Sequence, residues 1–375
     1  MNRRMRKQRY IWLSLFALLA AAAILGIALL IAGENGLGTG ILRRNVKNLT
    51  RERTSTTEFW YNNADGAVFA PMGGGFLIAD GVSIRSLDSD GEETVLASAE
   101  LGVPAADFSG DMALIYDLGG RYLCVCDRSG ILWSGEAEGN ILTASVNASG
   151  WIAVCTEAQS YKGAVTVYNH TGKALYRWSS GSGFVTGAAV SDNCRELAVL
   201  SLGSEGSRIG FFSLKEEEEL ARFTLPNAVI LDLSYRDKDT VAAVTESGVL
   251  FIGTDGTEEA RTSLPSPYPT HYSFDGEGFT ALSYVNNSVS VHGGIVTVND
   301  RGRQLAQLST ERQILSLSAA GRYIVVRYVD GITVYNSGLD PIYETQGMVD
   351  ALSIMAHTDG SFIAAGEYSA EIYGK

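Results

Sequence analysis

The sequence predicts an all-β protein, an eight-bladed β-propeller, preceded by one N-terminal transmembrane helix. Three observations predict this architecture. Residues 165–178 read as two strands joined by a polar turn that ends in Gly172, which is the pattern of a β-hairpin. Related hairpins recur at intervals of about 40 residues, the period of propeller blades. Finally, residues 11–32 contain no charged side chain, and such a run is long enough to cross a bilayer as a helix.

Four types of strand can be traced in each repeat, from an inner strand to an outer one. The turn position of Asn169 is occupied in the other six hairpins by Asp88, Asp127, Leu214, Gly253, Asn299 and Asn336. The inner, second and third strands each occur eight times, whereas the outer strand occurs seven times. Residues 56–61 are apolar-rich and precede the first inner strand. We expect them to complete the last blade and close the ring, because closure removes exposed edges. Seven blades are the alternative.

The N-terminal region predicts membrane attachment. Residues 1–10 contain five basic side chains and no acid, which places the N-terminus in the cytoplasm. The uncharged run is longer than the apolar core of about 7–15 residues in a cleaved signal peptide. We therefore expect a single-pass cell-membrane protein with an extracellular propeller. The expected divisions are a cytoplasmic segment (1–10), a transmembrane helix (11–32), a linker (33–55) and the propeller (56–375).

The net charge of the chain narrows the classes of possible partner. Asp and Glu number 42 against 29 Lys and Arg, and five of these basic residues lie in the first ten positions. The remainder is strongly acidic and would repel nucleic acid, so we exclude nucleic-acid binding.

The four cysteines lie in apolar strand patterns and are expected to be buried. A disulfide between neighbouring blades is the alternative. These residues are Cys124, Cys126, Cys155 and Cys194.

Turns followed by a tryptophan resemble those of quinoprotein-type propellers. The nearest matches are Asp127-Arg-Ser-Gly130 before Trp133, and Asn169-His-Thr171-Gly172 before Trp178. Other turns, such as Asn147-Ala-Ser-Gly150, resemble those of WD-repeat propellers. The whole arrangement is similar to an uncharacterised family of membrane-anchored propeller proteins of Gram-positive bacteria. Quinoprotein dehydrogenases hold a cofactor on adjacent cysteines, whereas a valine separates Cys124 from Cys126 here. No cofactor is therefore expected.

Signatures of catalysis and of metal binding are missing from the sequence. The sequence contains no G-x-S-x-G, H-E-x-x-H or P-loop pattern. The four histidines lie in different repeats without metal-ligand spacing, and we expect surface positions for them: His170, His271, His292 and His357. Acidic clusters, including Glu136/Glu138 and residues 216–219, are expected on or just after the outer turns, as a solvated rim. We predict no enzyme activity, no metal and no cofactor.

The face opposite those turns carries the long loops, and loops on a rigid scaffold often carry function. These loops are 159–163, 203–208, 265–272 and 286–294. The candidate partner-binding residues are Tyr161, Arg208, Tyr268, His271, Tyr272, Asn286 and His292. We predict a module that binds a protein or an envelope polymer through this face. One alternative is an envelope glycan hydrolase or lyase with its site in the central channel. Another is a structural scaffold with several partners on both faces.

Overall fold

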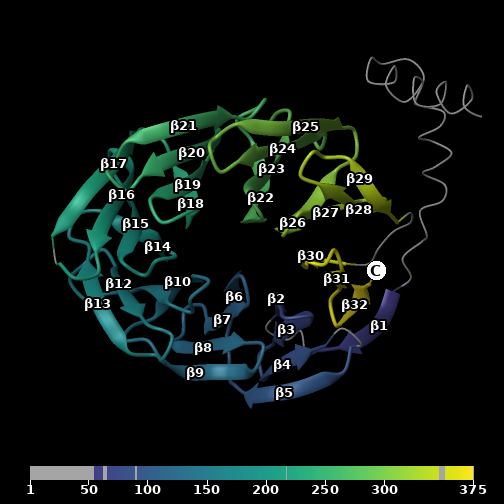
Figure 1. The fold of residues 1–375 in the computed structure, drawn as a ribbon, viewed down its shortest axis with the longest axis horizontal. Coiled ribbons are helices and arrows are strands. Elements are labelled where there is room, and N and C mark those ends of the chain that lie inside the picture. The colour runs from purple at the N-terminus through teal and green to yellow at the C-terminus, as the bar shows by residue number, and fades with distance from the viewer. Residues whose placement is uncertain (1–54, 62–65, 89–90, 217, 346–350, 375) are drawn as a thin grey trace, which may run out of the picture. The chain divides into compact units, whose positions relative to one another are not determined.

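The computed structural model describes residues 55–61, 66–88, 91–216, 218–345 and 351–374. These residues form eight four-stranded antiparallel sheets arranged as a ring (Figure 1). The eight-bladed fold is therefore confirmed, and the seven-bladed alternative is wrong. The expected membrane helix and most of the linker lie outside the described residues. Within the described ranges no helix is long and apolar enough to cross a membrane.

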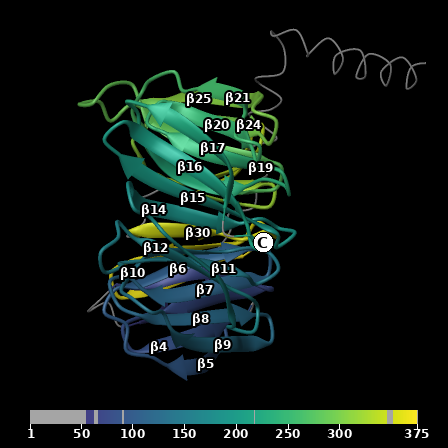
Figure 2. The ribbon, with the colours of Figure 1, turned by 90° about the vertical axis from the view of Figure 1, so that its left-hand side faces the viewer.

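In seven blades the four strands follow one another from the axis outward, as Figure 2 shows for β6 to β9. Blades 1 and 2 contain β2 (Val68–Met72), β3 (Gly75–Ala79), β4 (Ser83–Leu87), β5 (Glu93–Ser98), β6 (Pro104–Ser109), β7 (Met112–Asp117), β8 (Tyr122–Asp127) and β9 (Gly130–Glu136). Blades 3 and 4 contain β10 (Ile141–Val146), β11 (Ile152–Thr156), β12 (Ala164–Tyr168), β13 (Ala174–Ser179), β14 (Phe184–Val190), β15 (Glu196–Gly203), β16 (Gly206–Ser213) and β17 (Glu219–Pro226).

The second half of the ring repeats this order. Blades 5 and 6 contain β18 (Ile230–Tyr235), β19 (Thr240–Thr245), β20 (Gly248–Gly253), β21 (Glu258–Ser263), β22 (Pro269–Gly276), β23 (Phe279–Val285), β24 (Gly293–Asn299) and β25 (Gln304–Thr310). Blade 7 contains β26 (Ile314–Ala320), β27 (Tyr323–Tyr328), β28 (Gly331–Asn336) and β29 (Pro341–Glu344). Blade 8 contains β30 (Ser353–Ala356), β31 (Phe362–Ala365), β32 (Ser369–Tyr373) and β1 (Ser55–Trp60).

Blade 8 joins the two ends of the propeller. Its outer strand is β1, which pairs antiparallel with β32 so that Ser55 lies opposite Tyr373 and Trp60 lies opposite Ser369. The Tyr61 hydroxyl, just beyond β1, donates a 2.6 Å hydrogen bond to the carbonyl of Gly366. The predicted closure by residues 56–61 is therefore confirmed.

The meander of each blade gives the ring two different faces. Connections from the first to the second strand and from the third to the fourth lie on one face, which we call the turn face. Connections from the second to the third strand and from the fourth strand to the next blade lie on the other, which we call the loop face. Since β1 begins opposite Tyr373, the chain enters the propeller at the turn face.

Packing between neighbouring blades forms the core. Leu200 of β15 and Ile209 of β16 pack with Leu233 of β18 and Val241 of β19 in one buried cluster. Comparable clusters lie between the other blades. Both faces of the second and third strands are covered by adjacent blades. These strands therefore read as continuous apolar runs rather than as alternating patterns.

The turn chemistry read from the sequence has a direct structural role. Asn169 Oδ1 accepts hydrogen bonds from the backbone N–H groups of Thr171 and Lys173, at 3.1 and 3.0 Å. Gly172 follows at a positive φ of 77°. A Cβ there would also lie 2.8 Å from the Trp133 ring of the preceding blade. Glycine therefore allows both the turn and close contact between blades.

A β-bulge recurs near the start of the outer strand in blades 2 to 7. The residue without a cross-strand partner is Leu132, Leu175, Leu220, Glu259, Leu305 or Ile342. Bulges twist an exposed edge away from regular pairing. This repeated feature limits edge-to-edge association of the outer strands.

Candidate functional site

A water-accessible cavity of about 820 Å³ occupies the turn-face end of the central channel. Its walls are the later halves of the inner strands and the turns that follow them, and all eight blades contribute to them. Asp107, Asp232 and Asp275 come from blades 2, 5 and 6 and all line it. The fold thus brings together three carboxyl groups that are far apart in the sequence.

Asp107 joins blades 2 and 3. Its Oδ2 accepts a 2.7 Å hydrogen bond from the backbone N–H of Val146 on the neighbouring inner strand. Withdrawal from bulk solvent raises the pKa of Asp107 to about 8, and the negative charges of Asp275 and Asp232 add to this shift. At neutral pH this carboxyl group is therefore largely protonated.

Asp232 and Asp275 are held by neighbouring side chains and backbone. Asp232 accepts hydrogen bonds from the Leu233 N–H at 2.8 Å and from the Tyr272 hydroxyl at 3.2 Å. Burial raises its pKa. Asp275 accepts a 2.8 Å hydrogen bond from the Ser273 hydroxyl. Asp275 is exposed to the cavity, but protein surrounds it, and this desolvation raises its pKa to about 6.

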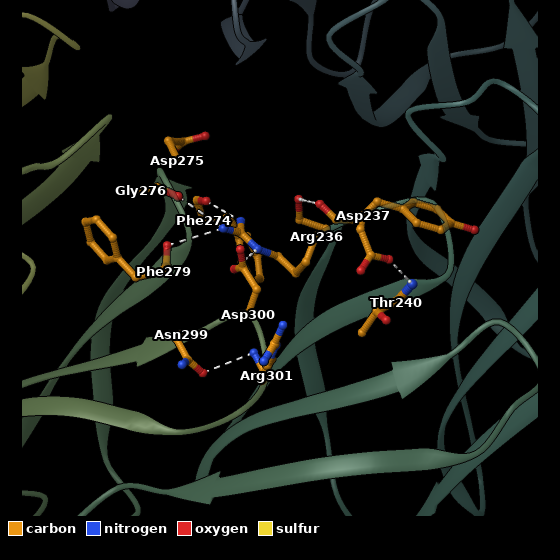
Figure 3. Close-up of polar contacts among 12 residues, drawn as sticks. Arg236, Asp237, Thr240, Phe274, Asp275, Gly276, Phe279, Asn299, Asp300 and Arg301 are labelled. Atoms are coloured by element: carbon orange, nitrogen blue, oxygen red, sulfur yellow. Dashed lines mark hydrogen bonds and ion pairs between the residues drawn. The ribbon is translucent and has the colours of Figure 1, made fainter.

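Arg236 is a cation that lines the same cavity, and its contacts hold blades together. Arg236 donates to the carbonyls of Phe274, Gly276 and Phe279 in blade 6, and its Nε lies 2.7 Å from Asp300 Oδ1 (Figure 3). Its charge lowers the pKa of Asp275 but does not offset the effect of burial. The cavity remains acidic.

The chemistry available in this cavity is that of partly protonated carboxyl groups. They can donate as well as accept hydrogen bonds, and groups with raised pKa values suit proton transfer. Carboxyl groups near the axis are also what the hydrolase alternative requires. In the part of the chain that the structure describes, no group of three or more His, Cys, Asp or Glu side chains is placed to hold a metal ion.

The loop face has a different character, because exposed apolar side chains gather there. Those on its loops and at the adjoining strand starts are Val82, Val103, Leu118, Leu142, Tyr161, Phe184, Leu231, Tyr268, Val289, Val291, Val329, Leu352 and Tyr368. The other large exposed apolar side chains in the described ranges lie on outer strands. An apolar surface rimmed by polar groups is typical of a protein-interaction site.

A second set of bulges places side chains at the loop-face mouth of the channel. In blades 3 to 7 one residue near the start of the inner strand has no cross-strand partner: Leu142, Thr186, Leu231, Thr270 or Leu315. Leu352 lies at the equivalent end of blade 8, one residue before β30. We call Leu142, Leu231, Leu315 and Leu352 the leucine collar.

The predicted site residues divide between loops, strands and the cavity. Tyr161 is exposed on a loop of blade 3. In blade 6, the Tyr268 carbonyl accepts from the Val285 N–H at 3.0 Å, and the Asn286 N–H donates to the His292 carbonyl at 2.9 Å. The structure thus brings Tyr268, Asn286 and His292 together and leaves Tyr161 apart from them.

Three predicted residues lie inside the scaffold. Arg208 is part of β16 and forms an ion pair with Glu219. The His271 ring lies 3.2 Å from the Ser283 hydroxyl, and burial lowers its pKa. Tyr272 lines the turn-face cavity. These three belong to strands rather than to the exposed part of the loop face.

Two other expectations need correction. His357 is buried rather than at the surface, and its Nε2 lies 2.9 Å from the Gly73 carbonyl, which joins blade 8 to blade 1. Glu136 ends β9 and Glu138 follows it, so this acidic pair lies at the loop face, where Glu138 forms an ion pair with Arg177. Contacts such as those of His357 with Gly73 and of Glu138 with Arg177 depend on how neighbouring blades pack. The periodicity of a single strand does not predict them.

Sequence reasoning missed the three cavity carboxyl groups that lie on inner strands. One signal was available for Asp107, because the equivalent inner-strand positions carry Ser145, Ser273 and Ser318. A carboxyl group at a position where three other inner strands carry serine departs from the repeated pattern. The meeting of Asp107 with Asp232 and Asp275 has no such signal, because it depends on ring closure.

The cysteines are buried or half-buried and are free. Cys124 Sγ lies 3.7 Å from Cys126 Sγ on one face of β8. The expectation of small buried residues is therefore confirmed for Cys124, Cys126 and Cys155 and wrong for Cys194, which is half-buried in the turn between β14 and β15. The disulfide alternative is not supported.

Solved structures with similar folds are distant in sequence. BamB from Moraxella catarrhalis is 14% identical, with a TM-score of 0.56 over 86% of this chain and 99% of that chain. The C-terminal WD40 domain of Sif2 is 13% identical, with a TM-score of 0.63 over 86% and 98%. The computationally designed Ika8 protein is 14% identical, with a TM-score of 0.58 over 82% and 95%.

These likenesses support the fold. Among curated proteins none matches this sequence. The family of unknown function DUF5711 matches residues 46–367, and the chain therefore belongs to this family.

Proposed function

We propose that this chain is a membrane-anchored, non-catalytic propeller that binds a partner protein through its loop face. The observation that carries the proposal is the gathering of exposed apolar side chains on that face. Aromatic and aliphatic side chains on a rigid scaffold bind with little loss of conformational freedom. The mouth of the channel, where the leucine collar lies, is the centre of the proposed surface.

The path of the chain supports the same face. β1 begins at the turn face, so the proposed anchor and linker are attached there. An anchor connected at one face leaves the opposite face free to meet a partner. The positive N-terminal segment favours a cytoplasmic N-terminus and an extracellular propeller.

The cavity carboxyl groups are the feature that favours the hydrolase alternative. Each of them, however, is held by a contact within the scaffold: Asp107 by Val146, Asp232 by Leu233 and Tyr272, and Asp275 by Ser273. Asp107 in particular occupies a position where serines make the same kind of connection between blades. These roles favour the non-catalytic function.

The test compares two triple variants of the full-length protein in crosslinked membranes. The first carries Leu142→Asp, Leu231→Asp and Leu352→Asp on the collar. The second is a control with Leu132→Asp, Leu175→Asp and Leu305→Asp on the outer strands. Exposure is matched for two of the three pairs, at 40% for Leu142 and Leu132 and 44% for Leu231 and Leu305, whereas Leu352 is 66% and Leu175 40% exposed.

We expect the collar variant to lose recovery of its partner protein by about tenfold or more, as for hot-spot residues of an interface, and the control to retain it. Circular dichroism would confirm that both variants are folded. Retention of every partner by the collar variant would overturn the loop-face assignment. Equal loss of partners from both variants would support the scaffold alternative. Recovery of an envelope polymer without any protein would show that the partner is a polymer rather than a protein.

A further inference from the structure

A pairing of one leucine and one acid recurs on the loop face. In four blades a collar leucine is followed fifteen positions later by a carboxylate. The pairs are Leu142 and Glu157, Leu231 and Glu246, Leu315 and Asp330, and Leu352 and Glu367. The identical spacing reflects an equivalent place in each blade, at the open end of the first two strands.

Backbone hydrogen bonds keep two of these acids, Glu157 and Glu246, beside their leucines. The Glu157 N–H donates to the carbonyl of Asn140, two residues before Leu142, at 2.9 Å. The Glu246 N–H donates at 3.4 Å to the carbonyl of Val229, two residues before Leu231. The leucines therefore lie near the channel mouth, with acids on the next strand outward.

The cations on this face already have partners. Arg312 forms ion pairs with Asp330 and Glu344 at 2.7 and 2.8 Å. Lys162 lies 4.7 Å from the centre of the Phe184 ring. Among the described residues no ion pair engages Glu157, Glu246 or Glu367, and all three are exposed. These carboxylates are available to a cationic partner.

We infer that the partner segment bound at the loop face is a cationic amphipathic one. Its apolar side chains contact the leucine collar, and its Lys or Arg side chains face Glu157, Glu246 and Glu367. This inference rests on the proposed function, since it specifies the chemistry of the partner at the same surface. Carboxylates around an apolar centre reject an acidic segment of equal hydrophobicity, because like charges repel.

The test uses full-length protein in nanodiscs of zwitterionic lipid and two fluorescent model peptides. Both have the same amphipathic helical pattern of leucines, with lysine at the polar positions of one and glutamate at those of the other. Fluorescence anisotropy measures binding, and empty nanodiscs give the blank. One variant carries Glu157→Gln, Glu246→Gln and Glu367→Gln. A turn-face control carries Glu92→Gln, Glu218→Gln and Glu277→Gln, which removes the same number of charges.

We expect only the lysine peptide to bind. Its affinity should fall at least about tenfold in the loop-face variant and in the collar variant, and remain unchanged in the turn-face control. Equal binding of both peptides, or a loss confined to the turn-face control, would overturn the inference. If collar substitutions abolish partner recovery while neither peptide is preferred, the proposed function stands and the inference fails. If partner recovery survives those substitutions, the proposed function fails.

Discussion

Asp107 lies at an inner-strand position where three other blades carry serine. The Ser145 hydroxyl donates to the Ala188 carbonyl at 2.7 Å, and the Ser318 hydroxyl accepts from the Ala356 N–H at 3.0 Å. A serine therefore connects neighbouring inner strands without introducing a charge. Asp107 makes the equivalent connection to Val146 with a carboxyl group that is costly to ionise in the cavity.

Replacing Asp107 by serine should change how stability depends on pH. The Asp107 pKa is about 8 in the folded protein and has an ordinary value of 3.8. The folded state therefore holds this proton more strongly, and the free energy of unfolding falls as pH rises from about 4 to about 8. One pKa unit corresponds to about 1.4 kcal/mol, and the partial exposure of Asp107 to the cavity reduces the full effect. We expect Asp107→Ser to be more stable than the parent by about 2 kcal/mol at pH 9.

Urea unfolding of both proteins at pH 4 and pH 9 checks this prediction, with the gain at pH 9 absent at pH 4. Ser145→Ala is the control, because it removes a hydrogen bond between blades without removing a charge. Its loss of stability should be the same at both pH values. A pH-independent effect of Asp107→Ser would contradict the assigned proton affinity.

β1 shows how one short strand completes the ring. Phe59 is 7% exposed and packs with Phe69, Ile363 and Ile372 in the cluster between blades 8 and 1. The adjacent Trp60 is 68% exposed. Because successive side chains of a strand point to opposite faces, Phe59 lies in the core and Trp60 lies in solvent.

Phe59→Ala should destabilise the propeller by about 3 kcal/mol, because it leaves a cavity at the closing contact. Trp60→Ala, one position along, should change the free energy of unfolding by less than about 1 kcal/mol. Chemical denaturation of the two variants measures the difference. Equal effects would show that β1 contributes little to closure of the ring.

The two ends of the channel differ in chemistry. At the turn face, carboxyl groups line a cavity of about 820 Å³. At the loop face, leucines surround the mouth, and exposed acids lie beyond them. The chain enters at the turn face, so a membrane tether would restrain that side. The ring thus has an acidic cavity on the side where the chain enters and an exposed apolar surface on the opposite side.

Protease treatment of intact cells that express the protein with an N-terminal tag tests the proposed placement. We expect the propeller to be lost and the tagged anchor fragment to survive, because the basic N-terminal residues favour the cytoplasmic side. Treatment after permeabilisation should remove the tag and shows that the protease is active. Full protection of the propeller in intact cells would place it in the cytoplasm and contradict the proposal.

Sequence patterns predicted the fold closely but the candidate site only in part. The blade number followed from the repeated strands and from the apolar residues 56–61. Tyr161 and Tyr268 were correctly expected on exposed loops. Arg208 and Tyr272 were not, because their partners Glu219 and Asp232 become visible only in the packed sheet. The collar was missed because bulges shift the alternation from which the orientation of a side chain is inferred.

What the sequence alone determined is local or periodic: the hairpins, the turns, the repeat length and the charge of each segment. These features depend on residues that are close in the sequence, and they recur in each repeat. The tertiary structure alone decided which distant side chains meet. Asp107 lines one cavity with Asp232 and Asp275, and His357 reaches Gly73, because ring closure sets these distances. The repeats and residues 56–61 predicted that the ring closes, but no local pattern encodes which side chains closure brings together, since those distances arise from the summed packing of all eight blades.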